Sequence, residues 1–123
     1  MSDKILDFYK GYEGENEIQF IKISPDGSKE MIKIWDGFFD DFMTKIKPEK
    51  EGWTSLAYYY HLVEGWNDES PWEIQDVLGA FEQLKQLNDI DFRFVKSKVV
   101  HHEVCKLLES ALKSNSRVYI ALE

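Results

Sequence analysis

Three side chains near the C-terminal end of the sequence are of types that bind metals or act as nucleophiles. His101 and Cys105 are four residues apart, so they share one face of a helix, and His102 is adjacent. A zinc site needs four protein ligands, or three and a water molecule, and no second ligand pair with suitable spacing accompanies them. A Cys–His nucleophile pair is also disfavoured, because Cys105 lies mid-helix and not at a helix N-terminus that would lower its pKa. We therefore expect structural roles for these residues and no metal site.

A second group that could do chemistry is the carboxylates Asp68, Glu69 and Glu73. A glycosidase acid/base pair needs a deep cleft and a raised pKa on one member, and a solvated acidic loop is the simpler interpretation. The sequence has no glycine-rich phosphate loop, no Gly-x-Ser-x-Gly elbow and no His-Glu-x-x-His motif. We expect no catalytic residue and no cofactor, and thus a protein that is not an enzyme.

The distribution of charge is more informative. The chain has 23 acidic and 15 basic residues and a net charge of −8, yet residues 51–84 contain seven acids and no Lys or Arg. The same window contains three of the four tryptophans and a run of three tyrosines. At least one of these tryptophans is expected in the core. Acids beside large amphipathic aromatics otherwise suit a surface that binds a basic partner. The predicted partner-binding residues are Tyr59, Glu64, Trp66, Asp68, Glu69, Trp72 and Glu73.

Length and composition limit the class of protein. A chain of 123 residues with 43% hydrophobic residues is typical of one globular domain. A net acidic chain is poorly suited to binding nucleic acid, and no run of 18 apolar residues could span a membrane. The N-terminus lacks the apolar region of a secretory signal, and a single cysteine fits a reducing cytoplasm. We therefore expect a cytoplasmic protein.

The elements that must position these residues follow from hydrophobic spacing and turn residues. In the first half, the pattern predicts a short helix from Ser2 to Gly11, a hairpin of 17–24 with 29–35 around Pro25-Asp26-Gly27, and a helix that Asp36 caps and Pro48 ends. The apolar stripe of that helix consists of Phe38, Phe39, Phe42, Met43 and Ile46.

The second half has one ambiguous segment, 53–64, for which helix is favoured over strand. The remaining predicted elements are an exposed turn at 66–72, a short extended piece at 72–74, a helix from Asp76 to Asn88 or Asp89, a strand at 90–95, a helix capped by Ser97 and ended by Asn115-Ser116, and a strand at 117–122. The expected core face of the helix after Asp76 is Val77, Ala80, Phe81, Leu84 and Leu87, and that of the last helix is Val100, Val104, Leu107, Leu108 and Ala111. Together they predict a single α+β domain, residues 1–123, with a small, largely antiparallel sheet packed with about four helices.

The stretch from Leu56 to Ile74, which reads LAYYYHLVEGWNDESPWEI, resembles segments of small bacterial immunity proteins. These are the cytoplasmic antidotes of polymorphic toxins, including those of contact-dependent growth inhibition systems. The resemblance covers about a sixth of the chain, and no motif in it fixes a functional residue by position. It implies a non-catalytic protein that binds its cognate toxin domain and masks the active site. Immunity proteins against nucleases are often acidic because their toxins are basic.

Physical reasoning on the same residues agrees with that function. A nuclease cleft attracts phosphates, so carboxylates on an inhibitor compete for the same Lys and Arg side chains. In this hypothesis the four acids of the predicted set attract the basic partner electrostatically. Trp66 and Trp72 are the anchors that become buried at the interface, and Tyr59 adds contact area. Two alternatives stay open. One is an acidic nucleic-acid mimic that inhibits another basic protein, or an adaptor of one. The other is a small carbohydrate-binding or enzymatic domain that uses the aromatic loop.

Overall fold

The fold is built on a five-stranded mixed sheet. The computed structural model describes residues 4–46 and 71–122, and the 53–64 segment with most of the 66–72 turn lies outside them. The sheet has the strand order β1-β3-β2-β5-β4, in which β1 and β3 are parallel and the other three pairs are antiparallel. The strands are β1 (Lys4–Phe8), β2 (Glu17–Ile23), β3 (Lys29–Trp35), β4 (Trp72–Glu73) and β5 (Arg117–Leu122). The α+β class, the largely antiparallel sheet, the 17–24/29–35 hairpin and the last strand are confirmed.

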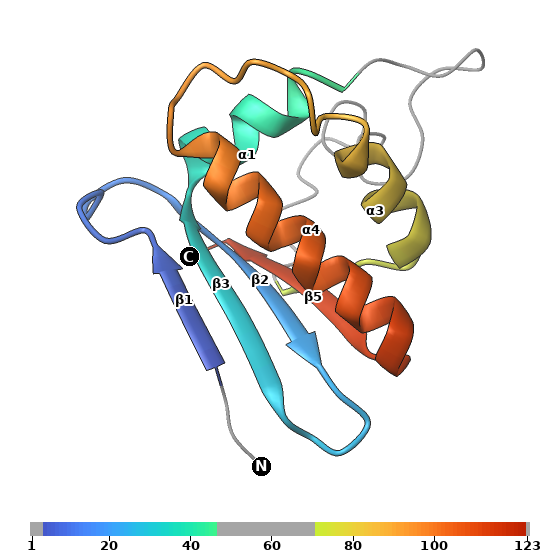
Figure 1. The fold of residues 1–123 in the computed structure, drawn as a ribbon. Helices are drawn as coiled ribbons and strands as arrows, with labels where there is room; N and C mark the ends of the chain where they lie inside the picture. Colours follow the sequence, from blue (N-terminus) through green and yellow to red (C-terminus); the bar gives the residue numbers. More distant parts are fainter. Residues whose placement is uncertain (1–3, 47–70, 123) are drawn as a thin grey trace.

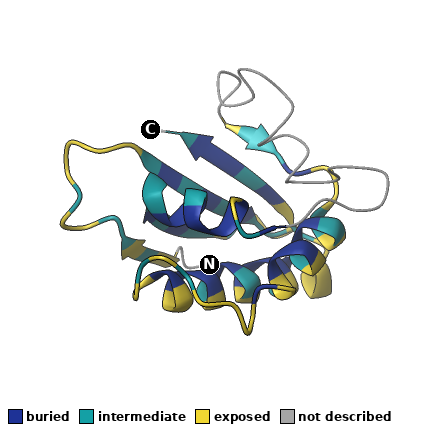
Figure 2. Ribbon diagram, turned by 90° about the horizontal axis from the view of Figure 1, so that it is seen from above, coloured by how far each residue is buried: buried dark blue, intermediate teal, exposed yellow. Residues whose placement is uncertain are grey.

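Three helices lie in the described part of the chain: α1 (Asp36–Met43), α3 (Val77–Lys85) and α4 (Ser97–Ser114). The sequence predicted about four. The long helix α4 crosses one face of the sheet, α1 lies beside it over the ends of β2 and β3, and α3 packs against α4 (Figure 1). Buried residues line the surfaces where these layers meet, and exposed residues lie on the outer side of α4 (Figure 2).

The core follows from the alternation of side chains along each strand. On β2, Ile18, Phe20 and Lys22 are buried and the residues between them are not. The predicted stripe of α4 is confirmed in full, because all five of its residues are at most 4% exposed. On α3, Ala80 and Leu84 are buried, as is Leu87 just beyond the helix, whereas Val77 and Phe81 are only partly buried. The largest fully buried side chains include Phe20, Phe38, Phe39, Phe42, Ile34, Leu84, Leu108 and Ile120.

The prediction of a helix from Ser2 to Gly11 is wrong. Residues Lys4–Phe8 form β1, which pairs in parallel with β3 along its whole length. The period of two in Leu6 and Phe8, which both pack against the core, outweighs the helical spacing. An isolated helix of this length is marginal, so the pairing with β3 decides the conformation.

The prediction of a strand at 90–95 is also wrong, and Asp41 is the reason. The amide groups of Arg93 and Phe94 donate hydrogen bonds of 3.0 and 3.1 Å to the carboxylate of Asp41, and not to a neighbouring strand. The segment therefore crosses over α1 as a loop, with the ring of Phe92 against Phe42. The alternation of apolar residues at 90–95 therefore belongs to a loop that Asp41 holds by hydrogen bonds, and not to a strand.

The helix ends differ in part from those predicted. Asp36 and Ser97 do not cap their helices but are the first residues of α1 and α4, whose N-caps are Trp35 and Lys96. The hydroxyl of Ser97 donates to Asp41 at 2.6 Å instead of accepting from its own helix. Asp76 caps α3 as predicted, by accepting from the amide of Gly79, and Asn115 ends α4 in the left-handed conformation.

Two predicted helix ends lie too late in the sequence. Helix α3 ends at Lys85, before Asn88 and Asp89, and isolated turns continue the chain from there. Helix α1 ends at Met43, so the buried Ile46 lies beyond it, and Pro48 falls outside the described residues. A search of the described helices for a length and apolarity sufficient to cross a membrane found none.

Candidate functional site

Only two of the seven predicted partner-binding residues lie in the described part of the chain, Trp72 and Glu73 of β4. Tyr59, Glu64, Trp66, Asp68 and Glu69 fall outside it. Trp72 is opposite Ile120 of β5, and its half-buried ring packs against the hydrophobic core. Glu73 is opposite Tyr119 and forms a 3.9 Å ion pair with Arg117, whose side chain is largely exposed. β4 thus places these two side chains on opposite faces of the sheet.

The described residues contain another acidic and aromatic surface, which the sequence analysis did not identify. It forms where the loop after β1, the end of β3, the start of α1 and the loop before α4 meet. The rings of Tyr12 and Trp35 are stacked, with centroids 4.7 Å apart and planes within 6°. Phe94 and Phe38 meet the indole edge-on, at 5.0 and 5.4 Å. Because these four rings come from four segments, they join those segments into one aromatic cluster.

The indole of Trp35 borders two open hollows. The larger, of about 450 Å³, is lined by Trp35, Gly37, Asp40, Arg93 and Phe94, among others. The smaller, of about 280 Å³, shares Trp35, Gly37 and Asp40 with it and adds Glu15, Asn16 and Asp36. We refer to Tyr12, Glu15, Trp35, Asp36, Asp40 and Phe94 as the Trp35 surface. Trp35, Gly37 and Asp40 line both hollows, so the indole lies between them.

The electrostatics of the Trp35 surface centre on Asp36. Burial raises the pKa of its carboxyl above the ordinary value, the nearby charge of Asp40 raises it further, and a hydrogen bond with Asn16 opposes these effects. The main chain also fixes this corner, since the amide of Asp36 donates to the carbonyl of Asn16 at 3.0 Å. A positive group that approached the two carboxylates would offset their mutual repulsion and favour the charged form of Asp36.

The buried ionisable groups elsewhere have structural partners. Asp41, which is 4% exposed, accepts the three hydrogen bonds from Arg93, Phe94 and Ser97 described above. The imidazole Nε2 of His101 hydrogen-bonds to the carbonyl of Leu84, which ties α4 to α3. The contacts of Asp41 position the loop 90–96, and with it Phe94, against α1.

The histidine and cysteine considered above lie where the sequence placed them. Cys105 Sγ is 3.5 Å from His101 Nε2 on the same face of α4. Burial raises the pKa of the Cys105 thiol to about 11, and burial lowers the pKa of His101. A thiol with that pKa is a poor nucleophile at neutral pH. In residues 4–46 and 71–122, no group of three or more His, Cys, Asp or Glu side chains is arranged to hold a metal ion.

Linear sequence analysis missed the Trp35 surface because its members lie far apart in the chain, from Tyr12 to Phe94. The local signal that could have found it is Trp35-Asp36-Gly37 followed by Asp40 and Asp41, an aromatic and three acids at a strand-to-helix junction. Comparisons of the chain with models of known protein families, with curated proteins and with solved structures found no match.

Proposed function

We propose that this chain is a non-catalytic, cytoplasmic immunity protein that binds a basic, nuclease-type toxin domain and covers its active site. The observation that supports this proposal best is the Trp35 surface, where Asp36 and Asp40 flank a partly exposed indole. Its acidic and aromatic composition is that of a surface which attracts a basic partner and then anchors it. The resemblance of residues 56–74 to immunity proteins points to the same class of partner.

The mechanism divides between charge and aromatic contact. The net charge of −8 attracts a positively charged cleft from a distance and raises the association rate. At contact, the carboxylates of Asp36 and Asp40 take the place of substrate phosphates on the Lys and Arg side chains of the cleft. Burial of the Trp35 ring then slows dissociation. An antidote needs both properties, because toxin that is free even briefly is harmful.

The environment of the buried polar groups supports the absence of catalysis. Asp41 and His101 are hydrogen-bonded to backbone groups of the described chain, and the raised pKa of Cys105 keeps it protonated. Among the described residues, the hollows beside Trp35 are not enclosed, which suits the binding of a protein surface. A surface without an activated group is suited to binding.

The test is affinity capture from the native strain at moderate salt, with the natural chain and an Asp36→Asn/Asp40→Asn variant side by side. We expect one basic protein to be recovered stoichiometrically with the natural chain and in reduced amount with the variant. The recovered protein should degrade DNA or RNA, and an equimolar amount of the chain should stop it. Failure to recover any basic protein would contradict the proposal.

Two other outcomes identify the alternatives. Recovery of a basic host or phage enzyme that is not a toxin would indicate a nucleic-acid mimic or an adaptor. Binding on a glycan array, accompanied by a change in tryptophan fluorescence, would indicate a carbohydrate-binding domain. Either result would replace the immunity function.

A further inference from the structure

The strand β1 is an edge of the sheet with no cover on its outer side in the described chain. It pairs with β3 and with no other strand of residues 4–46 and 71–122. Figure 1 shows it at the left margin of the sheet, away from the helices. Lys4, Ile5 and Asp7 are exposed, and Ile5 is 61% exposed. An edge of this kind offers backbone hydrogen-bonding groups to an additional strand.

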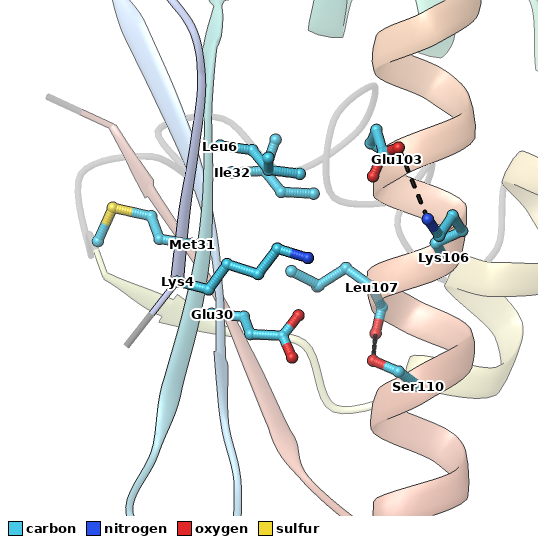
Figure 3. Close-up of a pocket in the computed structure, with 9 residues that line it drawn as sticks. All are labelled: Lys4, Leu6, Glu30, Met31, Ile32, Glu103, Lys106, Leu107 and Ser110. Atoms are coloured by element: carbon cyan, nitrogen blue, oxygen red, sulfur yellow. Dashed lines mark hydrogen bonds and ion pairs between the residues drawn. The ribbon is translucent and has the colours of Figure 1, made fainter. Parts of the chain in front are cut away.

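A groove runs directly beside this edge, between the β1–β3 pair and α4 (Figure 3). Leu6 and Ile32 point from the sheet toward α4, and Leu107 points back from the helix. These side chains form the apolar part of the lining of an open cavity of about 120 Å³. Since a cavity of ~150 Å³ holds a benzene ring, the groove has room for one aliphatic side chain.

The polar rim of the groove is held in place, with one exception. The buried Lys22 ammonium lies 3.1 Å from the carboxylate of Glu30 and 3.0 Å from the hydroxyl of Ser110, so it fixes these two side chains of the rim. On α4, Lys106 pairs with Glu103 at 3.7 Å. Lys4, by contrast, forms no ion pair with any residue that the structure describes. The rim therefore presents one ammonium group that a carboxylate could neutralise.

We propose that β1 and this groove bind an extended segment of a partner protein, which adds to the sheet beside β1. The incoming strand places an aliphatic side chain between Leu6 and Leu107 and an acidic side chain, two residues away, next to Lys4. A spacing of two puts both side chains on the helix-covered face. Backbone hydrogen bonds along β1 supply affinity, and the groove and Lys4 supply specificity.

Charge favours a foreign strand over a second copy of this chain. Two copies of the chain each carry a net charge of −8, and the repulsion between them opposes association. The strand site is separate from the Trp35 surface and does not depend on the proposed immunity function. If no strand binds beside β1, the proposed immunity function is unaffected. If no basic partner is captured, the proposed strand site is unaffected.

The experiment uses the isotope-labelled full chain and threonine-based heptapeptides. Each peptide carries one leucine and one glutamate two positions apart, with the leucine first in one peptide and the glutamate first in the other. We expect the peptide in one of the two orders to shift the amide signals of Lys4–Phe8 and to slow their exchange with solvent. Two further peptides are N-methylated at odd or at even residues. Because the amides of an extended strand alternate in direction, only one of the two methylated sets should abolish binding.

The variant Lys4→Glu should weaken binding of the peptide by about fivefold or more, the upper range for a surface ion pair. Lys98→Glu is the matched control, because Lys98 is exposed, lies in the first turn of α4 and does not line the groove. The proposal is overturned if millimolar peptide leaves the β1 amides unchanged or if both methylated peptides bind as well as the parent. It is also overturned if β1 becomes protected without peptide as protein concentration rises, since a second copy would then be the occupant.

Discussion

The indole of Trp35 occupies the space that a side chain on Gly37 would need. A Cβ atom on Gly37 would lie 2.4 Å from Cη2 of the indole and 2.5 Å from two more of its carbons, far inside van der Waals contact. The absence of a side chain at the second residue of α1 thus allows the ring to lie over the start of the helix. Tyr12 and Phe94 then pack on the ring, so Gly37 determines the position of the whole Trp35 surface.

We predict that Gly37→Ala destabilises the protein by about 1–3 kcal/mol, the usual cost of inserting a methyl group where a ring must move. The measurement is chemical denaturation together with tryptophan fluorescence. In a Trp35→Ala background the same substitution should stabilise by up to about 1 kcal/mol, because alanine is the better helix former. An equal effect in both backgrounds would show that Trp35 and Gly37 are not coupled.

Asp41 should be the most sensitive polar residue in the described chain. Asp41→Ala leaves two backbone amides and a hydroxyl without their acceptor, and we expect a loss of about 2–4 kcal/mol in the free energy of unfolding. Ser97→Ala, which removes only one of the three donors, should cost about 1 kcal/mol. Hydrogen exchange at Arg93 and Phe94 should accelerate in the Asp41 variant. Unchanged exchange there would disprove the role of Asp41 in holding the loop.

The stability of the protein should depend on pH through His101. Burial lowers the pKa of His101 in the folded state below 6.5. As the pH falls below about 6.5, the unfolded chain takes up a proton that the folded chain resists, so stability decreases, by at most about 1.4 kcal/mol per pH unit. Between pH 7.5 and 5, His101→Gln should show a shallower decrease than the natural chain. An equal decrease in the natural chain and in His101→Gln would contradict this role of His101.

Elements with a single dominant signal could be predicted from the sequence. The hairpin has a Pro-Asp-Gly turn between alternating strands, and α4 has an uninterrupted stripe that ends at Asn115. Two elements were predicted wrongly because distant partners decide them. Residues 4–8 become a strand by pairing with β3. Residues 90–95 form a loop in which Asp41, about fifty residues earlier, accepts hydrogen bonds from the amides of Arg93 and Phe94.

The Trp35 surface was not predicted from the sequence, and the site expected within residues 51–84 stays a prediction because most of it lies outside the described residues. An acidic surface with an exposed tryptophan was expected within residues 51–84, because the negative charge is concentrated there. The described example instead brings Tyr12, Trp35 and Phe94 together across the fold. The window from Trp35 to Asp41 contains part of this surface, but Tyr12 and Phe94 lie far from it in the sequence. The surface exists only in the folded chain, where packing brings these distant segments together.

The most direct test of the proposed function is the affinity of the captured basic partner for three forms of the chain. These are the natural chain, Asp36→Asn/Asp40→Asn, and a control with the same change in charge, Asp89→Asn/Glu109→Gln, at exposed positions away from Trp35. The account predicts that the first double variant binds at least about tenfold more weakly, a loss of ~1.4 kcal/mol, while the control stays close to natural affinity. Equal affinities for the two double variants would contradict it.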